Sequence, residues 1–381
     1  MKDFIFQNPT KVIFGKGSMS KLSESINPFG RKILLIYGGG SIKKNGIYST
    51  VLRELSEFDV REFSGIEPNP RVETIRVALN KTKGFDPDFV LAVGGGSVID
   101  ATKLYCSAYH YKGDPWDFLK NPDANPTRYI PFGVVLTISA TGSEMNCGSV
   151  ISKHETNEKT FFKRREIFPK FSIIDPENQY SLPKNQTAYG IVDAYSHVLE
   201  QYIHNLKDVP LQNRFSEGIM LTLIENAKPL LNDLRNYTYR SNVILCATMA
   251  LNNVIRMGTN EDWATHMIEH ELSAYYDIPH GLGLAIITPK WMEVVIKQKI
   301  EKLAHYGMVV WGLTGSTEDV AKQSIKKTFD FFKSLGIPMS LSAINIDKEH
   351  FESISTNLAK NKIGEIPLTK VQIFEILNKC L

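Results

Sequence analysis

The stretch FVLAVGGGSVID at residues 89–100 decides the fold class, because an apolar run, a glycine loop and a helical pattern follow one another in it. The same order recurs in KILLIYGGGS at residues 32–41. Further apolar runs lie at 133–138 and 171–175, and a shorter one at 11–14 is expected to form an edge strand. Runs that are apolar throughout are typical of strands covered by helices on both faces. The sequence therefore predicts an α/β domain with a Rossmann-like, mainly parallel sheet.

The second half of the chain has a different pattern. After Pro183, apolar residues recur with a period of 3.6 and glycines are few, which predicts helices. The expected helices span residues 187–204, 210–232, 241–256, 262–275, 316–336 and 369–379. We therefore expect two domains, an α/β dinucleotide-binding domain at 1–182 and an all-helical metal-binding and substrate domain at 183–381.

The composition excludes several classes of protein. The 381 residues include 44 Lys and Arg against 41 Asp and Glu, and the net charge of +3 does not indicate a nucleic acid or an anionic membrane as partner. No apolar run approaches the roughly 20 residues of a membrane span, and the N-terminus lacks the features of a signal peptide. The four cysteines are scattered without a CxxC pair, which is typical of reduced thiols. We therefore expect a cytoplasmic globular protein.

The two glycine loops are candidates for binding a dinucleotide. Glycine admits positive φ and the close approach of a ligand, and the N–H groups that open the following helix favour a phosphate. The standard G-x-G-x-x-G fingerprint is not met, because Lys43 and Ile99 stand where the third glycine would be. One such loop is more often a tight turn, but two identical loops after two strands favour a dinucleotide site.

The residues after the first loop bear on the choice between NAD(H) and NADP(H). NAD specificity usually requires an acidic side chain at a strand end, and none follows Tyr37. Instead, Gly39, Ser41, Lys43 and Lys44 leave room for a 2′-phosphate and offer groups that bind it. NADP(H) is therefore the expected cofactor. The alternative is that the two lysines form only a solvated helix face.

The helical half holds a set of metal-ligand residue types. Asp193 and His197 lie four residues apart, so a helix would place them on one face, and His266 and His270 repeat this spacing. His280 follows in an expected loop. Three imidazoles and a carboxylate suit Fe²⁺, Zn²⁺, Mn²⁺, Co²⁺ or Ni²⁺, although spacing does not decide which of His266 and His270 is the ligand. Each histidine taken alone is more often a hydrogen-bonded core residue.

A competing motif shares these residues. The segment from His266 to His270 matches H-x-x-E-H, the inverted zinc-protease pattern in which the glutamate is the general base. The match is short, and it leaves Asp193, His197 and both glycine loops without a role. A zinc metallopeptidase that uses His266, Glu269 and His270 stays open as an alternative.

Several motifs taken together resemble the iron-containing alcohol dehydrogenases, most closely the NADPH-dependent butanol dehydrogenase or aldehyde reductase branch. The resemblance runs nearly end to end. It is carried by YGGGSIKK at 37–44, GIEPNP at 65–70, AVGGGSVID at 92–100, ATGSE at 140–144, VDA at 192–194 with His197, and DWATH at 262–266. It implies a dehydroquinate synthase-like two-domain architecture and a homodimer formed through the N-terminal region.

The resemblance also implies roles for individual residues. One divalent metal, Fe²⁺ with Zn²⁺ as the alternative, would be bound by Asp193, His197, His266 and His280. His270 would lie in the cleft without ligating, either as the catalytic residue that relays protons or as a residue that only supports the site. The residues expected at the cofactor are Gly38, Gly39, Ser41, Asn69, Gly94, Gly95, Gly96, Ser97, Asp100, Thr137, Asn146 and Lys159.

The expected reaction transfers hydride between NADPH and small aliphatic aldehydes or alcohols. The metal would act as a Lewis acid on the substrate oxygen, and a proton would reach that oxygen through His270. A glycerol-type dehydrogenase or a lyase on the same scaffold is the main alternative, and a catalytically inactive metal-binding protein is another. The sequence leaves the native metal and the physiological substrate open.

Overall fold

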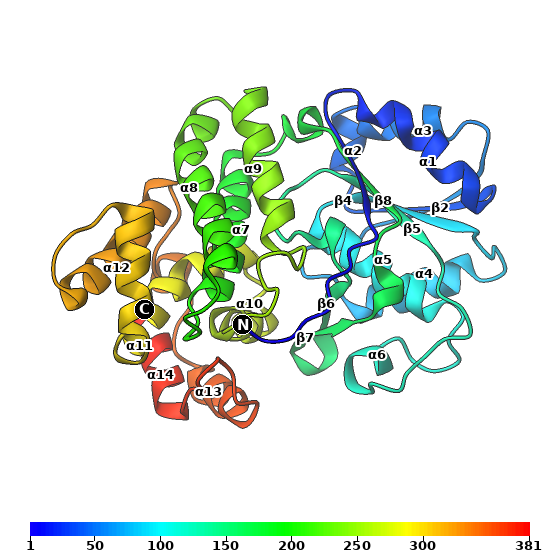
Figure 1. Cartoon of the computed structure of the whole chain (residues 1–381). Helices are drawn as coiled ribbons and strands as arrows, with labels where there is room; N and C mark the ends of the chain where they lie inside the picture. The colour runs from blue at the N-terminus through cyan, green and yellow to red at the C-terminus, as the bar shows by residue number, and fades with distance from the viewer. The chain divides into compact units, whose positions relative to one another are not determined.

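The computed structural model describes all residues from Met1 to Leu381. The chain forms two compact units, a sheet unit of Gln7–Leu182 and a helical unit of Met1–Phe6 together with Pro183–Leu381 (Figure 1). The first six residues therefore belong to the helical unit, although the sequence suggested the α/β domain for them. A backbone hydrogen bond of 2.9 Å from Lys2 N to Gly258 O ties them there.

The sheet unit is built on six parallel strands in the order β1-β8-β5-β4-β2-β3, which confirms the predicted parallel sheet and the edge position of its first strand. In β2, β4, β5 and β8 every residue except Lys32 is buried, which explains why these strands read as unbroken apolar runs. The strand bounds are β1 Lys11–Phe14, β2 Lys32–Tyr37, β3 Asp59–Ser64, β4 Phe89–Gly94, β5 Phe132–Leu136 and β8 Phe171–Ile174.

Three strands have no counterpart in the sequence prediction. The edge strand β3 buries only Phe63, so its sequence lacks an apolar run. The other two, β6 (Gly148–Lys153) and β7 (Glu158–Lys163), form an antiparallel hairpin around the charged stretch at 153–163. Their pairing depends on backbone hydrogen bonds more than on apolar burial, and for that reason hydrophobic pattern does not reveal them.

Helices cover both faces of the sheet. The segment with α1 (Leu22–Ile26), α2 (Ser41–Lys44) and α3 (Ile47–Glu54) packs on one face, and α4 (Val72–Thr82) and α5 (Gly96–Ala108) lie on the other, with the short α6 (Asp117–Lys120) beyond them (Figure 1). Strands β2 and β4 are adjacent and parallel, with Tyr37 paired to Val93. The two glycine loops therefore lie next to each other at one edge of the sheet, where ligands of such folds bind.

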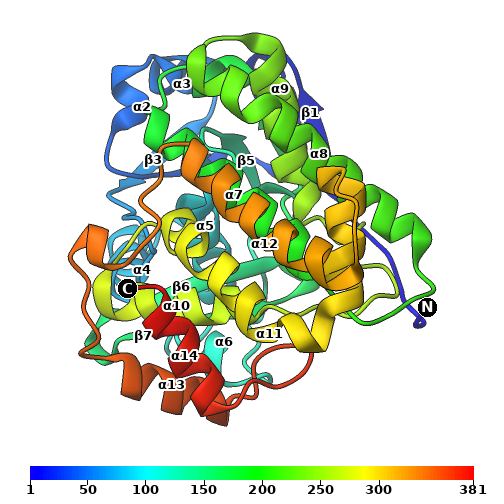
Figure 2. The same cartoon turned by 90° about the vertical axis from the view of Figure 1, so that its left-hand side faces the viewer.

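The helical unit contains eight α-helices and no strand, which confirms the predicted all-helical second half but exceeds the six helices expected. Their bounds are α7 Lys184–Tyr202, α8 Pro210–Asn232, α9 Tyr237–Ala250, α10 Ala264–Tyr276, α11 His280–Trp311, α12 Thr317–Ser334, α13 Phe351–Lys360 and α14 Lys370–Lys379. A single core of aliphatic and aromatic side chains joins them, and Figure 2 shows α12 alongside α11. Six of these helices match the expected segments, five to within three residues at each end and α9 to within six.

Two helices of this unit were missed, α11 and α13. The first turns of α11 are buried all round, from Gly281 to Pro289, so no polar face marks a helical period there. Two glycines and a proline in the same segment also argue against a helix by composition. The prediction that His280 lies in a loop was therefore wrong, because His280 is the first residue of α11.

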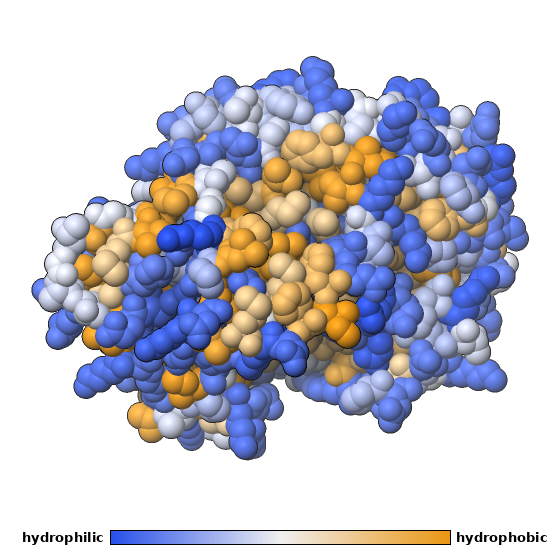
Figure 3. All heavy atoms as spheres, viewed as in Figure 1, coloured by the Kyte–Doolittle hydropathy of each residue, from blue (hydrophilic) through white to orange (hydrophobic).

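No helix combines the length and the apolarity that a membrane span requires. On the face drawn in Figure 3, charged and polar residues predominate, and hydrophobic residues gather over the helical unit. Leu211, Phe215 and Leu245 of α8 and α9 are among the exposed large hydrophobic side chains of this unit.

Candidate metal centre and cofactor loops

Helix α7 presents the first pair of candidate ligands. Asp193 and His197 lie one turn apart on the same face, and both side chains are buried. His197 Nδ1 lies 3.0 Å from Asp193 Oδ1. The expected i, i+4 pair is therefore formed.

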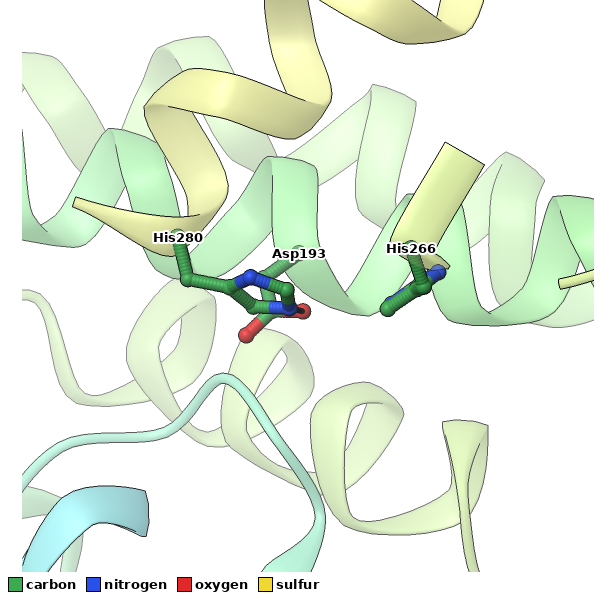
Figure 4. Close-up of side chains that lie close together, drawn as sticks. All are labelled: Asp193, His266 and His280. Carbon is green, nitrogen blue, oxygen red and sulfur yellow. Dashed lines mark ion pairs between the residues drawn. The ribbon is translucent and has the colours of Figure 1, made fainter. Parts of the chain in front are cut away.

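Helices α10 and α11 bring two more histidines to Asp193. One ligand atom from each of Asp193, His266 and His280 lies within 4.8 Å of the others (Figure 4). His280 Nε2 is 3.7 Å from Asp193 Oδ1. His197 lies beside this group, with its ring centroid 4.4 Å from that of His266. All four residues that the resemblance implies as ligands thus lie close together.

The close packing of α11 on α7 explains how His280 reaches Asp193. A Cβ at Gly281 would lie 2.2 Å from the backbone oxygen of Tyr189 in α7, a distance that no side chain tolerates. Glycine therefore lets the first turn of α11 lie directly against the α7 backbone. His280 precedes this glycine and Asp193 lies one turn after Tyr189, so the two side chains meet.

His270 belongs to a second group. One ligand atom of each of Glu269, His270 and His280 lies within 4.8 Å of the others, and the His270 ring centroid is 5.6 Å from that of His280. A metallopeptidase site would require His266 and His270 in one group, and neither group contains both. Glu269 has no exposed surface and is hydrogen-bonded to His280 and Ser273, so it is not placed as a general base. The geometry does not support a peptidase.

Two buried glutamates complete the site, and the sequence analysis did not assign them this role. Glu200 of α7 accepts hydrogen bonds from His266 Nδ1 and, at 2.6 Å, from the backbone N–H of Thr265. Glu269 of α10 accepts from His280 Nδ1. Glu200 lies three residues after His197 on the same helix, a spacing that places both on one side. That spacing was the available signal for Glu200.

The residues present fit a divalent metal. His266 Nε2 is buried and has no hydrogen-bond partner, which is costly unless another group meets it. Asp193 Oδ1 and His197 Nδ1 are buried 3.0 Å apart but without hydrogen-bond geometry. Burial by itself raises the pKa of the Asp193 carboxyl, but the nearby His197, His280 and His266 outweigh it, and the net pKa is lowered. An ionised carboxylate among imidazole nitrogens is a donor set that first-row divalent metals prefer.

A buried ion-pair network fixes the start of α10. Lys299 Nζ lies 2.9 Å from Asp262 Oδ2 and 2.9 Å from Glu365 Oε2, and it donates to Ile203 O at 2.8 Å. Asp262 Oδ1 in turn accepts from the backbone N–H of Ala264, the first residue of α10. The network therefore holds the turn that carries His266 two residues later.

The three glycines of the second loop are tightly packed against neighbouring side chains. A Cβ would lie 2.5 Å from the Val98 side chain at Gly94, 2.9 Å from Ile138 at Gly95 and 2.5 Å from Thr141 at Gly96. Helix α5 begins at Gly96, and its residues from Val98 to Ala108 are buried. The backbone N–H of Thr137 donates to Gly94 O at 3.0 Å, so this expected cofactor residue borders the loop.

The first glycine loop is open by comparison. A Cβ at Gly39 or Gly40 would meet nothing within 4 Å, and only Gly40 has positive φ, at 98°. Lys43 Nζ lies 4.8 Å from the ring centroid of Tyr48, a cation–π contact that holds this lysine near the loop. Gly38 is more closely packed, since a Cβ there would lie 3.2 Å from Ile66 O.

Asp100 and Asn146 are engaged with a buried lysine that the sequence analysis did not single out. Lys103 Nζ, which has no exposed surface, donates to Ser143 O at 2.8 Å, to Gly148 O at 2.7 Å and to Asn146 Oδ1 at 3.0 Å. Ser143 Oγ also donates to Asp100. These residues therefore tie the segment at 142–148 to α5, next to the second glycine loop.

Asn69 and Lys159, two more of the expected cofactor residues, lie together. Lys159 Nζ in β7 donates to Asn69 Oδ1 at 2.9 Å, and Asn69 has a positive φ of 50°. Their assignment to the cofactor stays a prediction, as does that of the glycine-loop residues.

Comparisons with known proteins match both halves of the chain. A family model described as iron-containing alcohol dehydrogenase matches residues 9–176, and one described as Fe-containing alcohol dehydrogenase family, C-terminal, matches residues 187–381. The chain is 44% identical over 388 residues to a Bacillus subtilis protein named probable NADH-dependent butanol dehydrogenase 1, and the match covers 100% of both. It is 41% identical over 369 residues to the NADPH-dependent aldehyde reductase YqhD of Escherichia coli, covering 96% of this chain and 95% of that protein.

A solved structure gives the same result for the fold. The crystal structure of YqhD from Escherichia coli K-12 aligns with 100% of this chain and 99% of its own, with a TM-score of 0.97 and 39% sequence identity. The names of the two relatives differ in the nicotinamide cofactor.

Proposed function

The chain belongs to the iron-containing alcohol dehydrogenase family, and from this premise we propose that it reduces small aliphatic aldehydes with NADPH at a divalent metal, as a butanol dehydrogenase-like enzyme. Oxidoreductase chemistry on alcohols, a metal and a nicotinamide cofactor follow from the family. The preference for NADPH, the identity of the metal and the aliphatic substrate are the proposal. The observation that carries it is the convergence of Asp193, His266 and His280 on one point.

Asp193, His197, His266 and His280 would hold the metal, with Fe²⁺ expected and Zn²⁺ as the alternative. When bound, the metal supplies Lewis-acid polarisation of the substrate oxygen. The carboxylate of Asp193 contributes the one negative charge of the ligand set, and the three imidazoles bind as neutral donors. Burial of Asp193, His197 and His266 keeps competing water hydrogen bonds away from them, whereas His280 is half-buried.

The first glycine loop supports the preference for NADPH. No carboxylate follows β2, the space at Gly39 is open, and Lys43 is held nearby by Tyr48. A 2′-phosphate needs room and positive charge, whereas a 2′-hydroxyl is best recognised by an acidic side chain. The Bacillus subtilis relative is named as NADH-dependent, so NADH is the alternative cofactor, and an assay with both nucleotides distinguishes them.

His270 would relay the proton to the substrate oxygen. It is buried one turn after His266 and belongs to the same group as His280, so it lies beside the candidate ligands without being one of them. Histidine titrates near neutral pH and suits this role. We further propose that the active form is a homodimer, which the molar mass in solution would test.

The experiment is an assay of butyraldehyde reduction with NADPH and with NADH, before and after removal of metal by a chelator. We expect turnover that favours NADPH, is lost on chelation and returns with Fe²⁺ or Zn²⁺. Turnover that survives complete removal of metal would contradict the metal centre. Turnover that favours NADH would contradict the cofactor preference alone.

A further inference from the structure

We infer that Glu269 is a positioning residue: it holds His280 at Nδ1 so that Nε2 faces Asp193, and Gly283 provides the space that this arrangement needs. The inference rests on the proposed metal centre. It gives a role to two residues of α10 and α11 that neither the spacing of the ligands nor the resemblance assigns.

Both oxygens of the Glu269 carboxylate accept hydrogen bonds inside the helical unit. The carboxylate has no exposed surface, and its two oxygens accept from different groups, Oε2 from His280 Nδ1 and Oε1 from Ser273 Oγ. The Ser273 hydroxyl also lies 3.2 Å from Ile278 O, in the turn that leads to α11. The carboxylate therefore sits between α10 and the beginning of α11.

This contact determines which nitrogen His280 presents. A carboxylate at Nδ1 favours the tautomer with a proton on Nδ1 and leaves the lone pair of Nε2 available. Nε2 is the nitrogen that lies 3.7 Å from Asp193 Oδ1. Glu269 thus orients the ring and increases its basicity as a ligand.

The second histidine of the group is held in the same way. Glu200 meets His266 at Nδ1, and His266 Nε2 is buried without a hydrogen-bond partner. Two histidines on different helices therefore show the same order, with a carboxylate at Nδ1 and with Nε2 on the opposite side of the ring. Two such pairs of carboxylate and histidine converge on Asp193, which indicates a metal site more strongly than one pair would.

Gly283 makes room for Glu269. A Cβ at this position would lie 2.7 Å from Glu269 Cγ and 3.0 Å from Ile278 Cδ1. Alanine would therefore displace the Glu269 side chain from His280, although residue 283 is not itself a member of either group of candidate ligands. Gly283 lies inside helix α11, where glycine is unfavourable relative to alanine.

The test measures the affinity of the protein for Zn²⁺ by competition with a chromophoric chelator. Outer carboxylates of this kind typically contribute about 10–100-fold to metal affinity, and we expect a loss in this range for Glu269→Ala. Glu269→Gln keeps an acceptor oxygen without the charge and should lose less. Glu271→Gln, which changes a glutamate of the same helix outside the group, is the matched control and should bind Zn²⁺ like the wild type.

A double-mutant cycle tests the role of Gly283. Gly283→Ala alone should weaken Zn²⁺ binding, but in the Glu269→Ala background it should change the affinity little, because the atom that it would displace is gone. The visible spectrum of the Co²⁺ form should change with Glu269→Ala and not with Glu271→Gln. A thermal melt of each variant separates a local effect from unfolding.

The outcomes distinguish this inference from the function on which it rests. Unchanged Zn²⁺ affinity in both Glu269 variants would overturn the role of Glu269. Additive effects of the Gly283 and Glu269 substitutions would overturn the role of Gly283. A wild-type protein that binds neither Zn²⁺ nor Co²⁺ would overturn the metal centre itself, and this inference with it.

Discussion

The candidate metal centre in the helical unit and the glycine loops in the sheet unit depend on opposite features. The metal centre is made of side chains, since Asp193, His266 and His280 reach one point from three helices. The second glycine loop depends on the absence of side chains, since a Cβ at Gly94 or Gly96 would lie 2.5 Å from a neighbouring side chain. Removing side chains should therefore damage the first region, and adding them should damage the second.

The two glycine loops differ from each other as well, although both read Gly-Gly-Gly-Ser. In the second loop all three glycines are required by neighbours within the sheet unit, whereas Gly39 and Gly40 of the first face open space. The same four letters therefore occur in two different settings, close packing in one loop and open space in the other. Substitutions that remove or add side chains test these differences.

The largest effect is expected from the metal centre. Asp193→Ala removes the carboxylate of the ligand set, and we expect kcat/KM for butyraldehyde to fall at least about a thousandfold, because a metal contributes several kcal/mol to the transition state. Binding of NADPH, measured by fluorescence, should change little. Asp208→Ala, on an exposed loop of the same unit, is the control. Retained turnover in the Asp193 variant would contradict the claim that the helical unit depends on its metal-ligand side chains.

The next effect is on folding stability in the glycine loops. Gly94→Ala places a methyl group 2.5 Å from Val98 Cγ2 and 2.6 Å from its Cβ, which cannot rotate away. We expect the free energy of unfolding to fall by about 2–3 kcal/mol in urea denaturation, as for other overpacked sites. Gly39→Ala meets no atom within 4 Å and should leave stability within about 0.5 kcal/mol of the wild type. Equal losses in both variants would refute the distinction between the loops.

A third substitution tests the open space for a 2′-phosphate. Gly39→Asp puts a negative charge where the phosphate is expected, and we predict that kcat/KM with NADPH falls about tenfold or more relative to that with NADH. Gly39→Asn has nearly the same size without the charge and should shift the ratio much less. If both variants shift the ratio equally, bulk rather than charge decides the cofactor. If neither variant shifts it, the phosphate lies elsewhere.

The smallest effect concerns Lys103, the buried charge beside the second loop. Burial lowers its pKa from 10.5 to about 8, so above pH 8 the folded chain has released a proton that the unfolded chain still binds. The free energy of unfolding contributed by Lys103 must therefore rise with pH in this window, by about 1 kcal/mol between pH 7 and pH 9. Lys103→Met lacks this term, so the difference in unfolding free energy between the two proteins should change by that amount. A difference that is constant over the window would contradict the shifted pKa.

How far the sequence predicts these regions depends on what determines them. Buried strands and the i, i+4 pairs are encoded locally, so the parallel sheet and the proximity of Asp193 to His197 follow from pattern. Helix α11 does not, because its first turns are buried on every side and carry Gly281 and Gly283. The reasons for those glycines lie in other helices, at Tyr189 and Glu269.

The same distinction explains the glutamates that were missed. Glu269 stood inside a motif that suggested a general base, but its partner is His280, eleven residues away in the next helix. Glu200 meets His266 across a separation of 66 residues. Contacts of this kind depend on how helices pack. The local spacing of Glu200 from His197 indicates only which side of α7 it lies on and does not identify His266 as its partner.

The most direct test of a metal centre on the helical unit is a measurement of bound metal in wild-type protein and in the His266→Ala variant. Both proteins are loaded with Fe²⁺ or Zn²⁺ and passed through a desalting column before the measurement. We predict about one equivalent per chain in the wild type and less than about a tenth in the variant, because removing one of few protein ligands weakens such a site severely. A variant that is folded by circular dichroism and still retains one equivalent would contradict the metal centre proposed for Asp193, His197, His266 and His280.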